Sequence, residues 1–265
     1  MDIRSCRELA KLLKTGAIDE DQFIEHLRRL PFLDLGDVKF DTHRSVRKGF
    51  AEVVYCPGKT MEQIRSIAES IRDSEEPVLF SRAGEETAQT VKEVLGSAVF
   101  YPKARIVGSL PMAKPAVPGV TVVSAGTSDI PVAEEAAVTA EYMGCIVSRL
   151  YDVGVAGVHR LLSYTELLQA SKAIVAVAGM EGALPTIIGG LVSCPVIAVP
   201  TSVGYGASLK GFAPLLTMLN SCALGVSVVN IDNGLGAGFC AGQIARQSRS
   251  SDELLTPPEK RGPSG

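Results

Sequence analysis

The sequence predicts a two-part α/β protein, in which a three-layer αβα domain with a parallel sheet follows a smaller α+β domain. From about residue 118, short continuous runs of Val, Ile and Ala alternate with helical patterns. Such runs are typical of strands buried on both faces, and their alternation with helices predicts a parallel sheet. Between residues 110 and 119, several prolines and a glycine interrupt any regular element and mark the boundary between the two parts.

Residues 1–117 form the predicted N-terminal domain. Two helical patterns within residues 3–30, separated by Gly16, predict a helical hairpin at its start. A further helix is predicted from Thr60 to Ile71, and another from Glu85 to Leu95. Short apolar runs around the last helix predict a small sheet; they cover residues 77–80, 98–101 and 105–107.

The N-terminal domain also contains a polar, largely basic cluster with two interpretations. It is either an ordinary solvated surface or a contribution to an active site, for example that of a neighbouring subunit. Its members are Asp41, His43, Arg44, Arg47 and Lys48.

Residues 118–248 form the predicted C-terminal domain, in which five apolar runs are each followed by a helical pattern. The last helix is predicted to begin near Ala237. Residues 249–265 are polar and rich in proline, and are predicted to be a disordered tail.

Composition excludes several functional classes. A net charge of −3 over 265 residues offers no broad basic surface for nucleic acid. The chain has no apolar run of about 18 residues that would span a membrane, and its start lacks the pattern of a secretory signal. Its six cysteines form no CxxC pair, which argues against a disulfide framework or a zinc site. We therefore expect a cytoplasmic protein with reduced thiols and without nucleic-acid or membrane partners.

The predicted carboxyl ends of the strands hold the candidate binding residues, because ligands of doubly wound sheets bind there. Two loops combine glycine with hydroxyl groups ahead of a helix, at residues 124–129 and 201–208. Such loops offer backbone N–H groups to a phosphate, although a tight turn uses the same residue types. The candidate ligand-binding residues are Gly126, Thr127, Ser128, Asp129, Arg160, Ser202, Gly204, Tyr205 and Ala207.

Three residues are candidates for catalysis. His159 follows a predicted strand, where an imidazole either moves protons or caps the surface. Glu181 follows a fully apolar run, where a carboxylate is either paired or chemically used. Cys222 lies between a helix and a strand rather than within one, and is either a buried helix-end thiol or a nucleophile. As a nucleophile at the carboxyl end of a helix it would need a cation such as Arg160 for activation.

The loop sequences together resemble a known family. The resemblance rests on SAGTSD, VHR, AVAGMEGALPTIIGGLVSCPVIAVPTS and VVNIDNGLGAG, which are similar to the aminoimidazole ribonucleotide carboxylase (PurE) fold. PTSVGYGAS, MLNSCALGVSVVNIDNG and the N-terminal FDTHRSVRKGFAEVVYCPGKT resemble more closely the LarB family of pyridinium-3,5-biscarboxylic acid mononucleotide synthases. This resemblance covers nearly the whole chain and implies a PurE/flavodoxin-like order of the parallel sheet.

The resemblance implies an enzyme of nickel-pincer nucleotide cofactor biosynthesis. It would carboxylate the pyridinium ring of nicotinic acid adenine dinucleotide with CO2 or bicarbonate and hydrolyse the phosphoanhydride, releasing AMP. Cys222 matches the position of the family's nucleophile. The resemblance also implies a homo-octamer without a tightly bound organic cofactor. We expect Mg2+ in the hydrolytic step, with Asp129, Glu181 and Asp232 as candidate ligands among which the sequence does not choose.

The chain departs from the PurE pattern at two loops. PurE proteins carry GSxSDW and AAHLPG, whereas this chain has Ile130 in place of the tryptophan and no histidine in residues 181–185. Purine carboxylation by aminoimidazole ribonucleotide carboxylase is therefore the second hypothesis. A non-catalytic nucleotide-binding module is the third, and it would need the glycine loops but no thiol.

Overall fold

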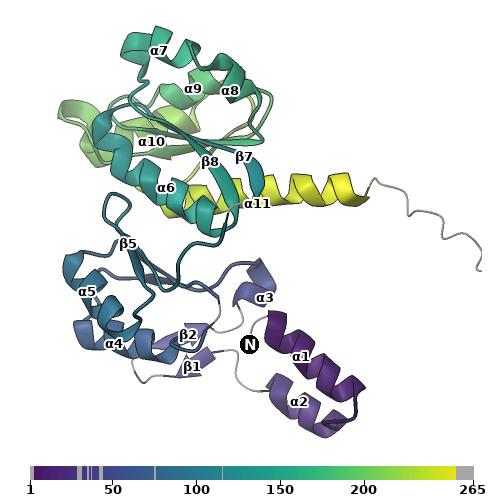
Figure 1. Cartoon of the computed structure of the whole chain (residues 1–265). Coiled ribbons are helices and arrows are strands. Elements are labelled where there is room, and N and C mark those ends of the chain that lie inside the picture. The colour runs from purple at the N-terminus through teal and green to yellow at the C-terminus, as the bar shows by residue number, and fades with distance from the viewer. Residues whose placement is uncertain are drawn as a thin grey trace, which may run out of the picture. The chain divides into compact units, whose positions relative to one another are not determined.

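The computed structural model describes residues 3–28, 32–34, 36, 38–41, 44–74, 76–114 and 116–254. The chain divides into two compact units, Met1–Met112 and Ala113–Gly265. This division falls within the proline-rich stretch between residues 110 and 119. Figure 1 labels helices and strands of both units.

The N-terminal unit begins with the predicted helical hairpin and continues into a short antiparallel pair of strands. These elements are α1 (Ile3–Lys14), α2 (Glu20–Arg28), β1 (Phe32–Asp34), β2 (Lys39–Asp41) and α3 (Arg44–Lys48). In the predicted polar cluster, Arg47 pairs with Asp41, and Arg44 pairs with Glu52 at 2.6 Å. His43 lies outside the described residues.

A four-stranded sheet with two helices completes this unit. The elements are β3 (Val53–Tyr55), α4 (Met61–Ser70), β4 (Leu79–Ser81), α5 (Glu85–Val94), β5 (Val99–Tyr101) and β6 (Ile106–Gly108). The strand order is β3-β4-β6-β5, with β3 and β4 parallel and the other pairs antiparallel. Thr60 begins α4 with a capping box, since its hydroxyl accepts from Gln63 N–H while the Gln63 side chain accepts from Thr60 N–H. The predicted α+β character is confirmed.

The C-terminal unit alternates strands and helices. Its elements are β7 (Val117–Ser124), η1 (Thr127–Asp129), α6 (Ile130–Tyr142), β8 (Cys145–Leu150), η2 (Val155–Gly157), α7 (Val158–Leu162), α8 (Thr165–Gln169), β9 (Ala173–Ala178), α9 (Leu184–Gly189), β10 (Val196–Pro200), η3 (Gly206–Gly211), α10 (Phe212–Leu219), β11 (Val226–Val228) and α11 (Gly234–Leu254).

All five strands of this unit are parallel, in the order β11-β10-β9-β7-β8. Numbered along the chain, this is the 2-1-3-4-5 order of flavodoxin-like sheets. Every residue of β9 and β10 is buried, as their unbroken apolar runs predict. The chain adds β8 on one side of β7 and then β9 on the other, so the strand order reverses between β7 and β9, which is where such sheets bind ligands.

Helices cover both faces of the sheet, so the predicted three layers are confirmed. Figure 1 shows α6 and α11 together on one face and α8, α9 and α10 on the other. Alternate residues of the central strands enter two separate cores: Val175 and Val177 pack with α6 and α11, whereas Ile174 and Ala176 pack with α8, α9 and α10. Helices packed on both faces of the sheet thus fix the strands whose carboxyl ends carry these loops.

The end of the chain differs from its prediction. The last helix runs to Leu254, so residues 249–254 are helical rather than part of a disordered tail. The first residues that would stop the helix are the prolines at 257 and 258. Residues 255–265 lie outside the described residues. Of the helices in the described part of the chain, none is both long and apolar enough to cross a membrane.

Candidate functional site

A cavity of about 580 Å³ opens at the carboxyl ends of the parallel strands, within the usual volume range of small-molecule sites. The loops that follow β7, β8, β9 and β10 line this cavity. It therefore lies where the strand order of the sheet reverses. The lining residues fall within 125–129, 152–160, 178–184 and 203–205.

Asp129 is the buried carboxylate of this pocket, with a side chain only 4% exposed. One carboxylate oxygen accepts a hydrogen bond from Gly126 N–H at 2.9 Å and the other accepts from the Thr201 hydroxyl at 2.7 Å. Burial raises the pKa of Asp129, and the charge of Asp232 adds to this, while the bonds from Thr201, Gly126 and Gly179 oppose it. Asp129 therefore ties together the loops that follow β7, β9 and β10.

The raised pKa of Asp129 predicts a pH-dependent stability. The folded protein binds this proton more tightly than the unfolded chain, so stability is lost as pH rises from the ordinary aspartate value of about 3.9 through the raised value. Asp129→Asn removes the titration, and its amide oxygen can still accept from Gly126 N–H while its NH2 group donates to the Thr201 hydroxyl oxygen. We expect the melting temperature of the variant, relative to that of the parent, to rise as the pH increases above the ordinary aspartate pKa of about 3.9. If the melting temperatures of the variant and the parent changed with pH in the same way, the raised pKa of Asp129 would be contradicted.

Arg160 supplies the cation of the pocket. It donates to the Asp152 carboxylate at 3.1 Å, and both side chains line the cavity. The Arg160 guanidinium packs on Gly157, where an added Cβ would lie 2.9 Å from Arg160 Nε and would require this side chain to shift. Sequence reasoning missed Asp152, although a charged residue directly after the β8 run carried the same signal that identified the other loops.

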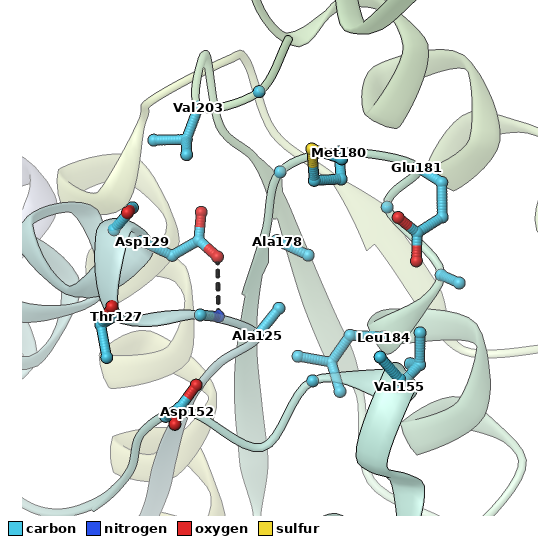
Figure 2. A pocket seen from close by; sticks show the side chains of 18 of the residues that line it. Ala125, Thr127, Asp129, Asp152, Val155, Ala178, Met180, Glu181, Leu184 and Val203 are labelled. Carbon is cyan, nitrogen blue, oxygen red and sulfur yellow. Dashed lines mark hydrogen bonds between the residues drawn. The ribbon is translucent and has the colours of Figure 1, made fainter.

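Glu181 lies across the cavity from Asp129, as Figure 2 shows. Unlike Asp129 it is exposed. The preceding Gly179 packs against the neighbouring loop so closely that a Cβ would lie 2.3 Å from the Val203 carbonyl oxygen. Met180 follows with a left-handed φ of 52°, a conformation that non-glycine residues adopt rarely. The loop after β9 thus presents a solvated carboxylate above the pocket from a tightly constrained backbone.

The structure gathers most of the predicted residues into this one pocket. Those that line it are Gly126, Thr127, Ser128, Asp129, Arg160, Glu181, Gly204 and Tyr205. Four others do not line it: His159, Ser202, Ala207 and Cys222. His159 is exposed on α7 rather than in a strand-end loop, and Ser202 N–H donates to Asp232 at 2.8 Å. Ser208, the last residue of the predicted loop 201–208, has a buried hydroxyl without a hydrogen-bond partner among the described residues, next to Gly204.

Cys222 lies in a neighbouring hollow of about 540 Å³ between α9 and the end of α10. Ala183, at the start of α9, lines both this hollow and the larger pocket. Cys222 is exposed, whereas Cys56 and Cys145 are buried. Burial raises the pKa of Cys56 to about 12 and also raises the pKa of Cys145, so these two thiols are suited to a structural role. Among the described cysteine side chains, Cys222 is the accessible thiol beside the pocket.

The described residues contain no group of three His, Cys, Asp or Glu side chains arranged to hold a metal ion. Mg2+ often needs fewer protein ligands, because it is commonly held by one or two carboxylates together with substrate phosphates. Of the three predicted candidates, Asp129 and Asp232 already accept hydrogen bonds from backbone N–H groups. Glu181 is exposed at the pocket and fits this kind of shared site best.

The chain is similar to several known proteins and family models. A solved structure of a Treponema denticola PurE2 variant is 18% identical, covers 54% of this chain and 100% of its own, and aligns with a TM-score of 0.37. A solved structure of Treponema denticola PurE is 19% identical, covers 53% of this chain and 99% of its own, and aligns with a TM-score of 0.38. An uncharacterised protein of Methanocaldococcus jannaschii is 37% identical over 253 residues, which is 92% of this chain and 98% of the relative. Family models described as the LarB/PurE-like N-terminal domain and as AIR carboxylase match residues 32–110 and 119–256. The chain therefore belongs to the LarB family, with an AIR carboxylase (PurE-like) C-terminal domain.

Proposed function

We propose that this protein carboxylates the pyridinium ring of nicotinic acid adenine dinucleotide at carbon 5 and hydrolyses its phosphoanhydride. The products are pyridinium-3,5-biscarboxylic acid mononucleotide and AMP, the first step of nickel-pincer nucleotide biosynthesis. Membership of the LarB family supports this proposal, and the AIR carboxylase domain supports a carboxylase in general. The observation that carries it is an exposed thiol, Cys222, in a hollow that shares Ala183 with the pocket at the strand ends.

The thiol explains how an electron-poor ring attacks CO2. The Cys222 thiolate adds to a ring carbon next to carbon 5, and the pyridinium accepts the electron pair to become an enamine. Carbon 5 then forms a bond to CO2, a base removes the proton from carbon 5, and the carbon–sulfur bond breaks to restore the aromatic ring. The net change replaces a ring hydrogen by a carboxylate and returns the thiolate.

The pocket residues have matching roles in this proposal. Thr127 and Ser128 are exposed in the loop after β7 and would bind ribose or phosphate. Arg160, shared with Asp152, would bind an anionic group of the substrate. Glu181 is a solvated carboxylate in reach of ligands in the pocket, and His159 remains a second candidate for moving the ring proton.

Mg2+ is part of the proposal for the hydrolytic step. When bound, it would offset the charge of the diphosphate and lower the pKa of an attacking water. Glu181 would hold Mg2+ together with substrate phosphate oxygens.

A homo-octamer is also proposed. The exposed apolar side chains Phe212, Leu216 and Leu219 on α10 support self-association. Light scattering that shows a monomer would contradict the octamer.

The direct test is to incubate the full chain with nicotinic acid adenine dinucleotide, bicarbonate and Mg2+ and to follow both products by liquid chromatography and mass spectrometry. We expect AMP and the dicarboxylated mononucleotide in equal amounts, and loss of AMP release in excess chelator. Aminoimidazole ribonucleotide is expected to be inert. The match to an AIR carboxylase model makes purine carboxylation the alternative, and turnover of that ribonucleotide alone would establish it instead.

A further inference from the structure

A cationic cluster lies at one end of the strands in the sheet of the N-terminal unit. It comes from three neighbouring chain segments that follow β3, follow β4 and precede β6. Its members are Lys59, Arg82, Lys103 and Arg105.

Strand register brings these segments together. Tyr55 of β3 is aligned with Ser81 of β4, which is aligned with Ile106 of β6. The next residues continue the row, because Cys56 N–H donates to the Ser81 carbonyl at 3.1 Å and Ala83 N–H donates to the Arg105 carbonyl at 2.7 Å. Neighbouring strands lie about 4.8 Å apart, so the backbones of Arg82 and Arg105 are adjacent.

The remaining members lie in the turns beside this row. Lys59 N–H donates to the Cys56 carbonyl and closes a turn. Burial raises the pKa of the Cys56 thiol, and the charge of Lys59 opposes this with a smaller effect. Lys103 is exposed in a turn that is closed by a hydrogen bond from Arg105 N–H to the Pro102 carbonyl.

Three charges of this cluster, those of Lys59, Lys103 and Arg105, differ from other cationic charges of the unit. Arg44, Arg47 and Arg65 each form an ion pair with a carboxylate. Within the described part of the chain, no ion pair involves Lys59, Lys103 or Arg105. Like charges in neighbouring segments repel one another, and an anion bound among them lowers this cost. The acidic residues nearest in sequence are Glu62, in the first turn of α4, and Glu85 and Glu86, in the first turn of α5.

An aromatic ring completes the cluster. The Arg82 guanidinium lies over the Tyr55 ring at 5.9 Å from its centre, and Tyr55 is 54% exposed. The capping box of Thr60 and Gln63 already occupies the amino end of α4. Four cations are also fewer than the six to ten phosphate contacts typical of nucleic-acid binding.

We propose that this cationic cluster binds the phosphate group of a nucleotide, with the Tyr55 ring beside its base. Arginine and lysine form charge-assisted hydrogen bonds to phosphate oxygens, and an exposed aromatic ring is a common platform for a base. The proposal does not depend on the reaction proposed above, because it concerns binding to the N-terminal unit alone.

The test is hydrogen exchange of the full chain, measured by mass spectrometry at low ionic strength with AMP, inorganic phosphate or adenosine. We expect AMP and phosphate to slow exchange in peptides that cover residues 55–60, 82–86 and 102–106, and adenosine to leave them unchanged. In the double variant Lys59→Gln/Arg105→Gln the half-saturating AMP concentration should rise about 10-fold or more. Lys92→Gln, a matched change at an exposed lysine of α5, should not alter it.

Three results would overturn the proposal: no slowing in these peptides, equal slowing by adenosine, or unchanged AMP binding in a folded double variant. The comparison of AMP with adenosine needs only the parent protein, so it holds even where the double variant fails to fold. Peptides that cover residues 124–129 and 178–184 report the C-terminal pocket separately. Slowing there alone removes this inference and leaves the proposed reaction standing.

Discussion

Cys222→Ser is expected to lower the rate of ring carboxylation by about 10⁴-fold or more, as removal of a covalent nucleophile does in other enzymes. Serine is not appreciably ionised near neutral pH, and an alkoxide leaves the ring less readily than a thiolate. Because Cys222 is exposed after α10, exchanging sulfur for oxygen should cost little stability. The measurement is the rate of formation of the dicarboxylated mononucleotide, with melting temperature as the test of folding.

Cys194→Ser is the matched control, since Cys194 lies just before β10 and lines neither the pocket nor the Cys222 hollow. It should carboxylate at close to the parent rate. AMP release measured in the same samples separates the two half-reactions, because hydrolysis needs no thiol. A folded Cys222→Ser protein that carboxylates the ring at the parent rate would exclude the covalent mechanism and return Cys222 to a structural role.

Much of the fold could be predicted because the strands of the C-terminal unit are buried on both faces. The runs at β9 and β10 contain no polar residue that would make them ambiguous, and the helices between them follow at once. The least accurate prediction concerned the chain end, where the boundary was set by composition. Helix α11 continues through polar residues to Leu254, since polar side chains are compatible with a helix until a proline interrupts it.

The sequence could predict which loops form the site, but not how their side chains contact one another. Strand-end placement identified eight lining residues, because all parallel strands end at the same edge of the sheet. It could not show that Asp129 bonds to Thr201, a contact 72 positions away in sequence. It also could not show that Cys222 faces a separate hollow, since that depends on how α10 packs beside α9.

The close packing of α6 against α11 predicts a large loss of stability from one methyl group. A Cβ at Gly238 would lie 2.2 Å from the Ala136 carbonyl oxygen, and one at Gly234 would lie 2.2 Å from the Val132 carbonyl oxygen. Both obstacles are backbone atoms of a buried helix, which cannot move aside as a flexible side chain would. The two glycines are four residues apart and therefore lie on the same face of α11.

Gly238→Ala is therefore expected to destabilise the folded protein by about 3 kcal/mol, as overpacking of a dense core does, and to lower the melting temperature by roughly 6 to 12 °C. Helix propensity alone predicts the opposite sign, since alanine is favoured over glycine within a helix by about 1 kcal/mol. Gly190→Ala is the control: the residue has a helical φ of −78°, and the nearest atom to its Cβ is at an ordinary 3.5 Å. That change should be neutral or stabilising. A Gly238→Ala protein as stable as the parent in thermal unfolding would show that α6 and α11 do not pack at this distance.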